Sequence, residues 1–269
     1  MAMTRTMAAV CVTWSALIAG CSDSSFSFGN HPDVIWWTDH ESGDLSEWKE
    51  GTPNGGFILP GNSRVEVAKG IARSGEYALH IQDQSHDARD FPLAARTGPL
   101  PVEVYCSAWF YMPAPLKPKD YWWFVLFRSR QPPYDGKSAF RDEIALSFTT
   151  RADGSVGTVV RARSPMNPPD STELDASLPP LLDLPVPVGQ WFHIEVFHRT
   201  GTDDSGHFMV WQDGQLTFDV AGRNAQTTWA EWMLGGVVDA LTTDASQLYI
   251  DDAAIAKRRL GPTEPFTRE

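Results

Sequence analysis

Two segments of the chain place aromatic and ionisable side chains at every second position. In residues 105–112, Trp109 and Tyr111 alternate with apolar residues, and in residues 141–148, Arg141 and Glu143 precede a similar alternation. Alternate residues of a β-strand share one face, so each pair is expected to point away from the apolar side of its strand. Flat aromatic rings cover the apolar faces of sugar rings, and guanidinium and carboxylate groups bind hydroxyls or carboxylates. These residue types therefore suit the binding of a saccharide.

Three further arginines, Arg128, Arg161 and Arg163, lie on predicted strands that could neighbour these two segments. They stand out because the chain is acidic, with 22 Lys and Arg against 34 Asp and Glu and a net charge of -12. A concentration of guanidinium groups on one sheet suggests an anionic polysaccharide as the ligand. The alternative is that these arginines are merely solvated and that a proline-rich loop covers Trp109 and Tyr111.

The composition excludes several classes of protein. No apolar run approaches the ~20 residues that span a bilayer, which excludes an integral membrane protein. The acidic balance argues against a nucleic-acid partner, for which a basic face is expected. Of the three cysteines, Cys106 alternates with apolar residues and is expected to be a buried, unpaired thiol.

The first residues have the pattern of an export signal. Arg5 precedes the mostly apolar stretch 7–19, and this stretch ends at Ile18-Ala19-Gly20-Cys21, which resembles the bacterial lipobox. We expect residues 1–20 to be a lipoprotein signal peptide, Cys21 to carry lipid, and residues 21–33 to form a flexible tether. The resemblance to known lipoproteins implies that Ser22, in place of Asp, favours sorting to the outer membrane, and we expect the protein to contact the membrane through the lipid only. The alternative is an ordinary signal peptide with an incidental cysteine.

The remainder of the chain has the pattern of an all-β protein. Turn signals separate stretches of period two, and Asp213-Gly214 between two apolar stretches is the strongest hairpin signal. The pattern predicts a two-sheet antiparallel sandwich, with a single domain over 34–260 and a tail over 261–269. The proline-rich segment 165–187 is expected to form a wall or lid. The predicted strands cover residues 63–69, 77–83, 105–112, 121–128, 141–148, 155–163, 191–199, 207–212, 215–220, 232–238 and 247–256.

The order of several motifs resembles the concanavalin A-like jelly roll of laminin-G-like domains, legume-type lectins, laminarinase-type hydrolases and several polysaccharide lyases. The motifs are the G-x-W strand that begins at Gly189, the W-x-D-G hairpin at Trp211, and the segments 41–48, 73–81 and 248–252. The resemblance implies a concave sheet across which sugar lies. The residues that it assigns to that ligand face are Trp109, Tyr111, Arg128, Arg141, Glu143, Arg161 and Arg163.

The resemblance leaves catalysis open. In laminarinase-type hydrolases one strand carries E-x-D-x-E, but here Glu143 is followed by Ala145 and Ser147, which argues against retaining hydrolysis. A lyase needs a cation beside the uronate carboxylate, a base at C5 and an acid for the leaving oxygen. The catalytic candidates are Glu143, Arg141, Tyr111 and His193. The main expectation is a polysaccharide-binding domain, with a polysaccharide lyase or glycoside hydrolase as the alternative and a laminin-G-like adhesion module as the second.

The resemblance also implies a structural metal site, because jelly-roll modules often hold Ca²⁺ between their first and last strands. Glu41, Asp44, Asp251 and Asp252 are oxygen ligands of the kind that Ca²⁺ takes. The alternative is that these side chains are acidic strand ends in contact with water. No other cofactor is required by any motif in the chain.

Overall fold

The computed structural model describes residues 32–49, 56–59, 63–83, 92–96, 100–115, 122–129, 144–162, 176–222, 224, 231–238 and 246–262. The predicted signal peptide, Cys21, Arg141, Glu143 and Arg163 lie outside the described residues. The backbone of Arg128 is described and its side chain is not. In the described part, no helix is long and apolar enough to cross a membrane.

The described strands form two antiparallel sheets, which we call sheet A and sheet B. Sheet A has the order β13-β12-β11-β6-β15-β4-β3, with β1 paired to β15. Its strands are β1 (Val34–Thr38), β3 (Arg64–Lys69), β4 (Tyr77–Asp83), β6 (Glu103–Tyr111), β11 (Trp191–Arg199), β12 (His207–Gln212), β13 (Gln215–Ala221) and β15 (Ser246–Ala256). These strands confirm the predicted segments on this sheet, to which the structure adds β1.

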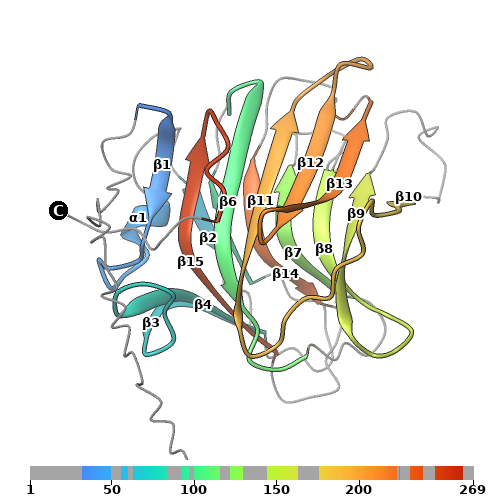
Figure 1. The fold of residues 1–269 in the computed structure, drawn as a ribbon. Coiled ribbons are helices and arrows are strands. Elements are labelled where there is room, and N and C mark those ends of the chain that lie inside the picture. Colours follow the sequence, from blue (N-terminus) through green and yellow to red (C-terminus); the bar gives the residue numbers. More distant parts are fainter. Residues whose placement is uncertain are drawn as a thin grey trace, which may run out of the picture.

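Sheet B has the order β10-β9-β8-β7-β14-β5-β2. Its strands are β2 (Gly56–Leu59), β5 (Leu93–Arg96), β7 (Trp122–Ser129), β8 (Ile144–Thr150), β9 (Val156–Ala162), β10 (Ala176–Leu178) and β14 (Trp232–Val238). A single turn of helix, α1 (Ser46–Lys49), is the one helix among the described residues. The two sheets lie face to face in Figure 1, which confirms the predicted jelly-roll sandwich.

The core lies between the two sheets and is rich in aromatic rings. Phe148 of β8 meets Phe192 of β11 at 6.2 Å between ring centroids, and Phe127 of β7 meets Phe208 of β12 at 5.4 Å. Each of these pairs joins a strand of sheet B to a strand of sheet A. Burying one such ring contributes roughly 1.5–3 kcal/mol, so these contacts are a major part of what holds the layers together. Cys106 is also in this core and is unpaired, as predicted, and burial raises the pKa of its thiol.

The hairpin between β12 and β13 turns at Asp213 and Gly214, as predicted. Both residues have positive φ, 49° and 79°. A two-residue turn with positive φ at both positions matches the right-handed twist of the flanking strands. Asp213 also accepts a hydrogen bond from the backbone N–H of His193 through its carboxylate (2.8 Å), which ties the hairpin to β11.

Candidate functional site

Two of the predicted arginines, Arg128 and Arg161, take neighbouring register positions in sheet B, one on each side of the same residue of β8. Ile144, Leu146 and Phe148 of β8 are in the core, so Ala145 and Ser147 lie on the opposite face. Ala145 is paired with Arg128 of β7 on one side and with Arg161 of β9 on the other. Neighbouring strands are about 4.8 Å apart, so the register places these two arginines about 10 Å apart across the face.

Trp109 and Tyr111 do not join this row, so the predicted single ligand face was wrong. Their strand, β6, lies in sheet A between β11 and β15, whereas β7, β8 and β9 lie in sheet B. The outer faces of two stacked sheets point in opposite directions. Alternation along β6 correctly placed both rings away from the core, but it carries no information about which sheet the strand joins. Arg161 and Trp109 therefore lie on opposite sides of the sandwich.

On sheet A, the rings around Trp109 and Tyr111 contact one another. Tyr111 lies 5.5 Å from Trp191 and 6.2 Å from Tyr249 between ring centroids, and Tyr249 stacks on His80 at 4.4 Å with an interplanar angle of 7°. Such cross-strand ring pairs stabilise a sheet. Burial and the nearby carboxylate of Glu66 raise the pKa of Tyr249, so the phenolate that a base would need is disfavoured there.

His193 is buried beneath this face. Its Nε2 lies 2.7 Å from Ser107 Oγ, a geometry that in an open site would suit a nucleophile and its base. However, Ser107 and His193 are only 3% and 1% exposed. Burial, with smaller contributions from Arg259 and Arg73, lowers the pKa of His193 to about 3. Arg73 also covers one face of Trp109, with its Cζ 4.5 Å from the ring centroid.

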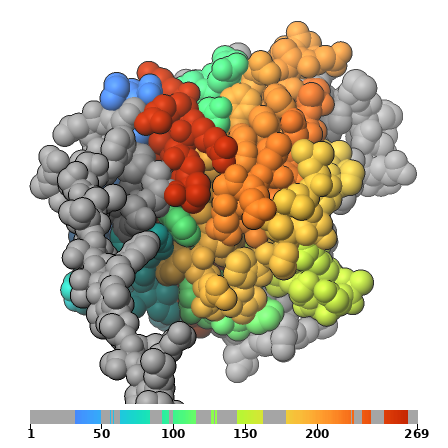
Figure 2. Space-filling view, in the orientation of Figure 1, coloured from blue at the N-terminus to red at the C-terminus, as the bar shows by residue number. Residues whose placement is uncertain are grey.

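A C-terminal strap, residues 257–262, covers another part of sheet A. Glu195 of β11 is fully buried and accepts hydrogen bonds from the backbone N–H groups of Leu260 (2.6 Å) and Gly261 (3.1 Å) and from Arg259 Nε (3.2 Å). Arg259 also lies over the ring of Trp211, 4.5 Å from its centroid. Figure 2 shows the red C-terminal residues beside the orange β12–β13 region on this face. The strap closes this part of sheet A to a ligand.

The four acidic residues predicted to bind Ca²⁺ accept hydrogen bonds from backbone and hydroxyl groups. Glu41 Oε1 accepts from the backbone N–H groups of Glu76 and Tyr77, both at 2.9 Å. Asp44 Oδ1 accepts from the backbone N–H of Ser46 at 2.8 Å, where it caps α1, and hydrogen bonds with the side chain and the backbone of Ser46 lower the pKa of Asp44.

The two aspartates of β15 behave similarly. Asp251 Oδ2 accepts from the backbone N–H groups of Arg73 (2.8 Å) and Ser74 (3.2 Å), and Asp252 Oδ1 accepts from Ser74 Oγ (2.8 Å). Among the described residues, no three His, Cys, Asp or Glu side chains are grouped so that they could hold a metal ion. The calcium site stays a prediction, and in the described residues Glu41, Asp251 and Asp252 hold residues 73–77 beside the middle of β15.

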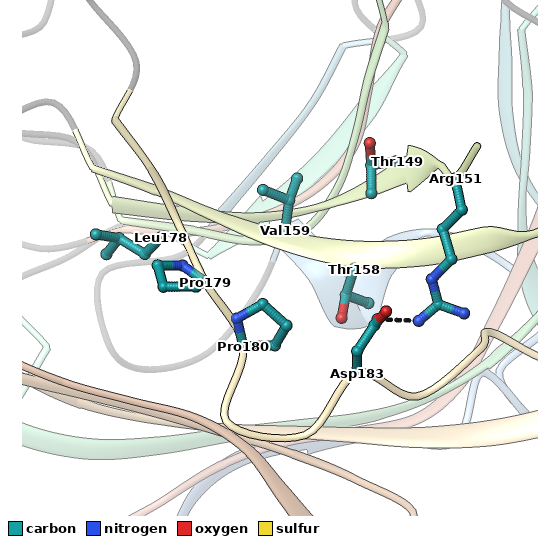
Figure 3. Close-up of a pocket in the computed structure, with 8 residues that line it drawn as sticks. All are labelled: Thr149, Arg151, Thr158, Val159, Leu178, Pro179, Pro180 and Asp183. Carbon is teal, nitrogen blue, oxygen red and sulfur yellow. Dashed lines mark hydrogen bonds and ion pairs between the residues drawn. The ribbon is translucent and has the colours of Figure 1, made fainter.

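A pocket of about 330 Å³ opens at the edge of sheet B (Figure 3). The pairing of β9 with β10 ends at Val160 and Leu178, so the residues of β9 before Val160 form the edge of the sheet, and the pocket lies beside them. Arg151 forms an ion pair across the pocket with Asp183. Sequence patterns did not single out these two residues, because each looks like a solvated charge beside a turn. The residues that line the pocket are Thr149, Arg151, Thr158, Val159, Leu178, Pro179, Pro180 and Asp183.

Several solved structures with a similar fold are polysaccharide lyases. An endo-β-1,4-glucuronan lyase from the fungus Trichoderma reesei aligns with a TM-score of 0.56 at 14% identity, covering 78% of this chain and 94% of that one. A variant of the alginate lyase Aly36B in complex with an alginate trisaccharide aligns at 0.57 and 12% identity, covering 87% and 98%. The alginate lyase vAL-1 from Chlorella virus aligns at 0.54 and 9% identity, covering 84% and 100%.

A search of curated proteins finds no match to the chain. The polysaccharide lyase family, however, matches residues 40–254, which include both sheets from the end of β1 into β15. This match covers most of the sequence and agrees with the jelly-roll architecture. The chain therefore belongs to the polysaccharide lyase family.

Proposed function

We propose that the protein is a lyase that cleaves a uronate-containing polysaccharide, with the substrate lying across the outer face of sheet B. The family supports this reading over the non-catalytic binding that the sequence first suggested. Two structures of similar fold are named for glucuronan and alginate, which are both uronate polymers. The observation that carries the proposal for this chain is the row in which Ala145 separates Arg128 from Arg161.

The proposed reaction is a β-elimination. A base removes the proton at C5 of a uronate residue, the C4–O bond breaks, and the leaving oxygen takes up a proton from an acid. The electron pair of the C5–H bond becomes the C4–C5 double bond, so no water is consumed. Negative charge develops on the uronate carboxylate as the proton leaves, and a fixed cation beside it stabilises the transition state.

The arginine row would supply that cation. A guanidinium group binds a carboxylate through two parallel hydrogen bonds and stays charged at all relevant pH values. Tyr111 and His193, the earlier candidates for the base, lie on sheet A and cannot serve a substrate on sheet B. We therefore propose that the acid and base come from side chains near β7 and β8. Glu143, two positions before Ala145, remains the candidate in the sequence for the acid or base, and Arg141, four positions before Ala145, would be a further cation.

Arg161→Ala is expected to lower kcat/KM for an acidic polysaccharide about 10- to 100-fold, as for loss of one transition-state donor. Turnover is measured by the ultraviolet absorbance of the new unsaturated uronate ends. Arg64→Ala is the matched control, because Arg64 lies on β3 of sheet A and its side chain is exposed. Equal activity of the two variants would contradict placement of the substrate on sheet B. Binding of uronate polymers without turnover would favour a non-catalytic domain.

We also propose that the protein is exported and anchored to the cell envelope through lipid on Cys21, which lies outside the described residues. Metabolic labelling with an alkyne-tagged fatty acid tests this proposal. The label is expected on the full chain and is expected to be lost in Cys21→Ala. Label that persists in Cys21→Ala would contradict it.

A further inference from the structure

The pocket at the edge of β9 is a second charged site on sheet B. It lies on the same strand as Arg161, but it is built by a different part of the chain. We propose that this pocket binds one uronate residue of the substrate, beyond the arginine row, and that Arg151 binds its carboxylate. This inference rests on the proposed function, because it assigns an outer binding position to the same acidic polysaccharide.

One wall of the pocket is the described end of the proline-rich segment. Leu178, Pro179 and Pro180 face the strands, as Figure 3 shows. The segment is held at both ends: the backbone N–H of Leu181 donates to the carbonyl of Thr217 (2.8 Å), and that of Val186 donates to the carbonyl of Val156 (2.8 Å).

A third bond, from Gln212 Nε2 to the carbonyl of Pro185 (2.8 Å), ties this segment to β12 of sheet A. Fixed proline dihedrals and these anchors keep the wall in place without a ligand, which lowers the entropic cost of binding. Apolar walls with a few polar groups are typical of sites that take a sugar ring. Here the polar groups on the side of Pro180 are the hydroxyl of Thr158 and the guanidinium of Arg151, whereas Thr149 points to the other side of the strands.

Arg151 is placed over β9 by the β8–β9 turn. Its backbone N–H donates to the carbonyl of Ser155 (2.8 Å), and Gly154, with φ of 83°, closes the turn. The guanidinium then lies over Gly157, where a Cβ would come within 2.7 Å of Arg151 Nε. The absence of a side chain at Gly157 therefore makes room for the guanidinium on the outer side of the strand. Gly157 and Arg161 are four residues apart on that side, about 13 Å, so the two cations could bind different sugar residues.

The present partner of Arg151 can be exchanged. Arg151 Nη2 donates to Asp183 Oδ1 and also to the backbone carbonyl of Leu184 (2.6 Å). The side chain of Asp183 is 61% exposed and that of Arg151 is 18% exposed. An ion pair with so exposed a partner contributes little to stability, so a substrate carboxylate can replace Asp183 at small cost. The bond to Leu184 would keep the guanidinium in place during the exchange.

The test measures the affinity of the full chain for uronate hexasaccharides by calorimetry, beside the same hexasaccharides with their carboxylates reduced to alcohols. Arg151→Ala is expected to raise the dissociation constant for the acidic ligand about tenfold, the loss of one charge-assisted interaction. Asp183→Asn is expected to lower it several-fold, because it frees the guanidinium. Neither variant should change the weaker binding of the reduced ligand. Arg199→Ala, an exposed arginine of sheet A paired with Glu103, is the matched control.

In turnover assays the effect of Arg151→Ala is expected on KM rather than on kcat. Arg151→Lys keeps the charge and checks folding, and it should recover part of the affinity. The inference is overturned if Arg151→Ala and Arg151→Lys both bind the acidic ligand like the wild type, or if acidic and reduced ligands lose affinity equally. If the wild type cleaves a uronate polymer and both variants bind the acidic ligand normally, the role of the pocket is refuted and the proposed function is not. A wild-type protein that neither binds nor cleaves any uronate polymer would refute the proposed function as well.

Discussion

Glu195→Gln is expected to lower the free energy of unfolding by about 3–5 kcal/mol, the cost of removing one charge of a buried pair, because the donors around the carboxylate then face a neutral amide. The carboxylate of Glu195 is fully buried beneath the C-terminal strap. It accepts from two backbone N–H groups, those of Leu260 and Gly261, and from Arg259. A glutamine has one acceptor oxygen, and its NH₂ group would face a donor.

The loss should appear as a fall in Tm of roughly 6–20 °C for a chain of this size. Glu103→Gln is the matched control, since Glu103 lies on the neighbouring strand of the same sheet but its side chain is 58% exposed. Its ion pair with Arg199 should contribute less than about 1 kcal/mol. If both variants unfold at the same temperature, the strap does not stabilise sheet A in the way the hydrogen bonds indicate.

Acid is expected to destabilise the protein well before its carboxylates titrate. Burial lowers the pKa of His193 to about 3 and that of His198 to about 4, so both are neutral in the folded protein where they would be charged in the unfolded chain. The unfolded chain binds more protons as pH falls below about 6.5, and stability is lost from there towards the folded pKa values. At about pH 5 the loss is about 2 kcal/mol for each histidine.

His198→Leu tests the contribution of one of these two histidines directly. His198 lies between Phe127 and Phe208 in the core, and neither of its ring nitrogens has a hydrogen-bond partner among the described residues. The variant should roughly halve the difference in unfolding free energy between about pH 7.5 and about pH 5, measured by urea unfolding. Val196→Ala, a core change without a titrating group, should lower stability equally at both pH values. A His198→Leu variant that keeps the wild-type pH dependence would refute neutral burial of His198.

The alternation of side chains predicted most of the fold because it depends on residues that are close in sequence. The inward set of β8, the outward position of Trp109 and the Asp213-Gly214 turn all follow from local spacing and turn chemistry. Sheet membership does not. Whether β6 neighbours β8 or β11 depends on which loops cross between the layers, and no property of Trp109 or Arg161 records that choice.

The parts of the candidate site that sequence reasoning missed depend on contacts between distant residues. The position of the Arg151 guanidinium depends on its ion pair with Asp183, 32 positions later, and on the space that Gly157 leaves. Asp251 has the side-chain type of a metal ligand, and in the structure its carboxylate accepts hydrogen bonds from the backbone N–H groups of Arg73 and Ser74. Side-chain type thus indicated the chemistry available, whereas the long-range pairing decided where each group is used.

Cleavage by elimination is tested most directly by the mass of the products released from glucuronan or alginate oligosaccharides. Elimination adds no water, so the masses of the two fragments should sum to that of the substrate, with the unsaturated end on the fragment that carried the C5 proton. Fragments whose summed mass exceeds that of the substrate by one water molecule would identify hydrolysis and contradict cleavage by elimination.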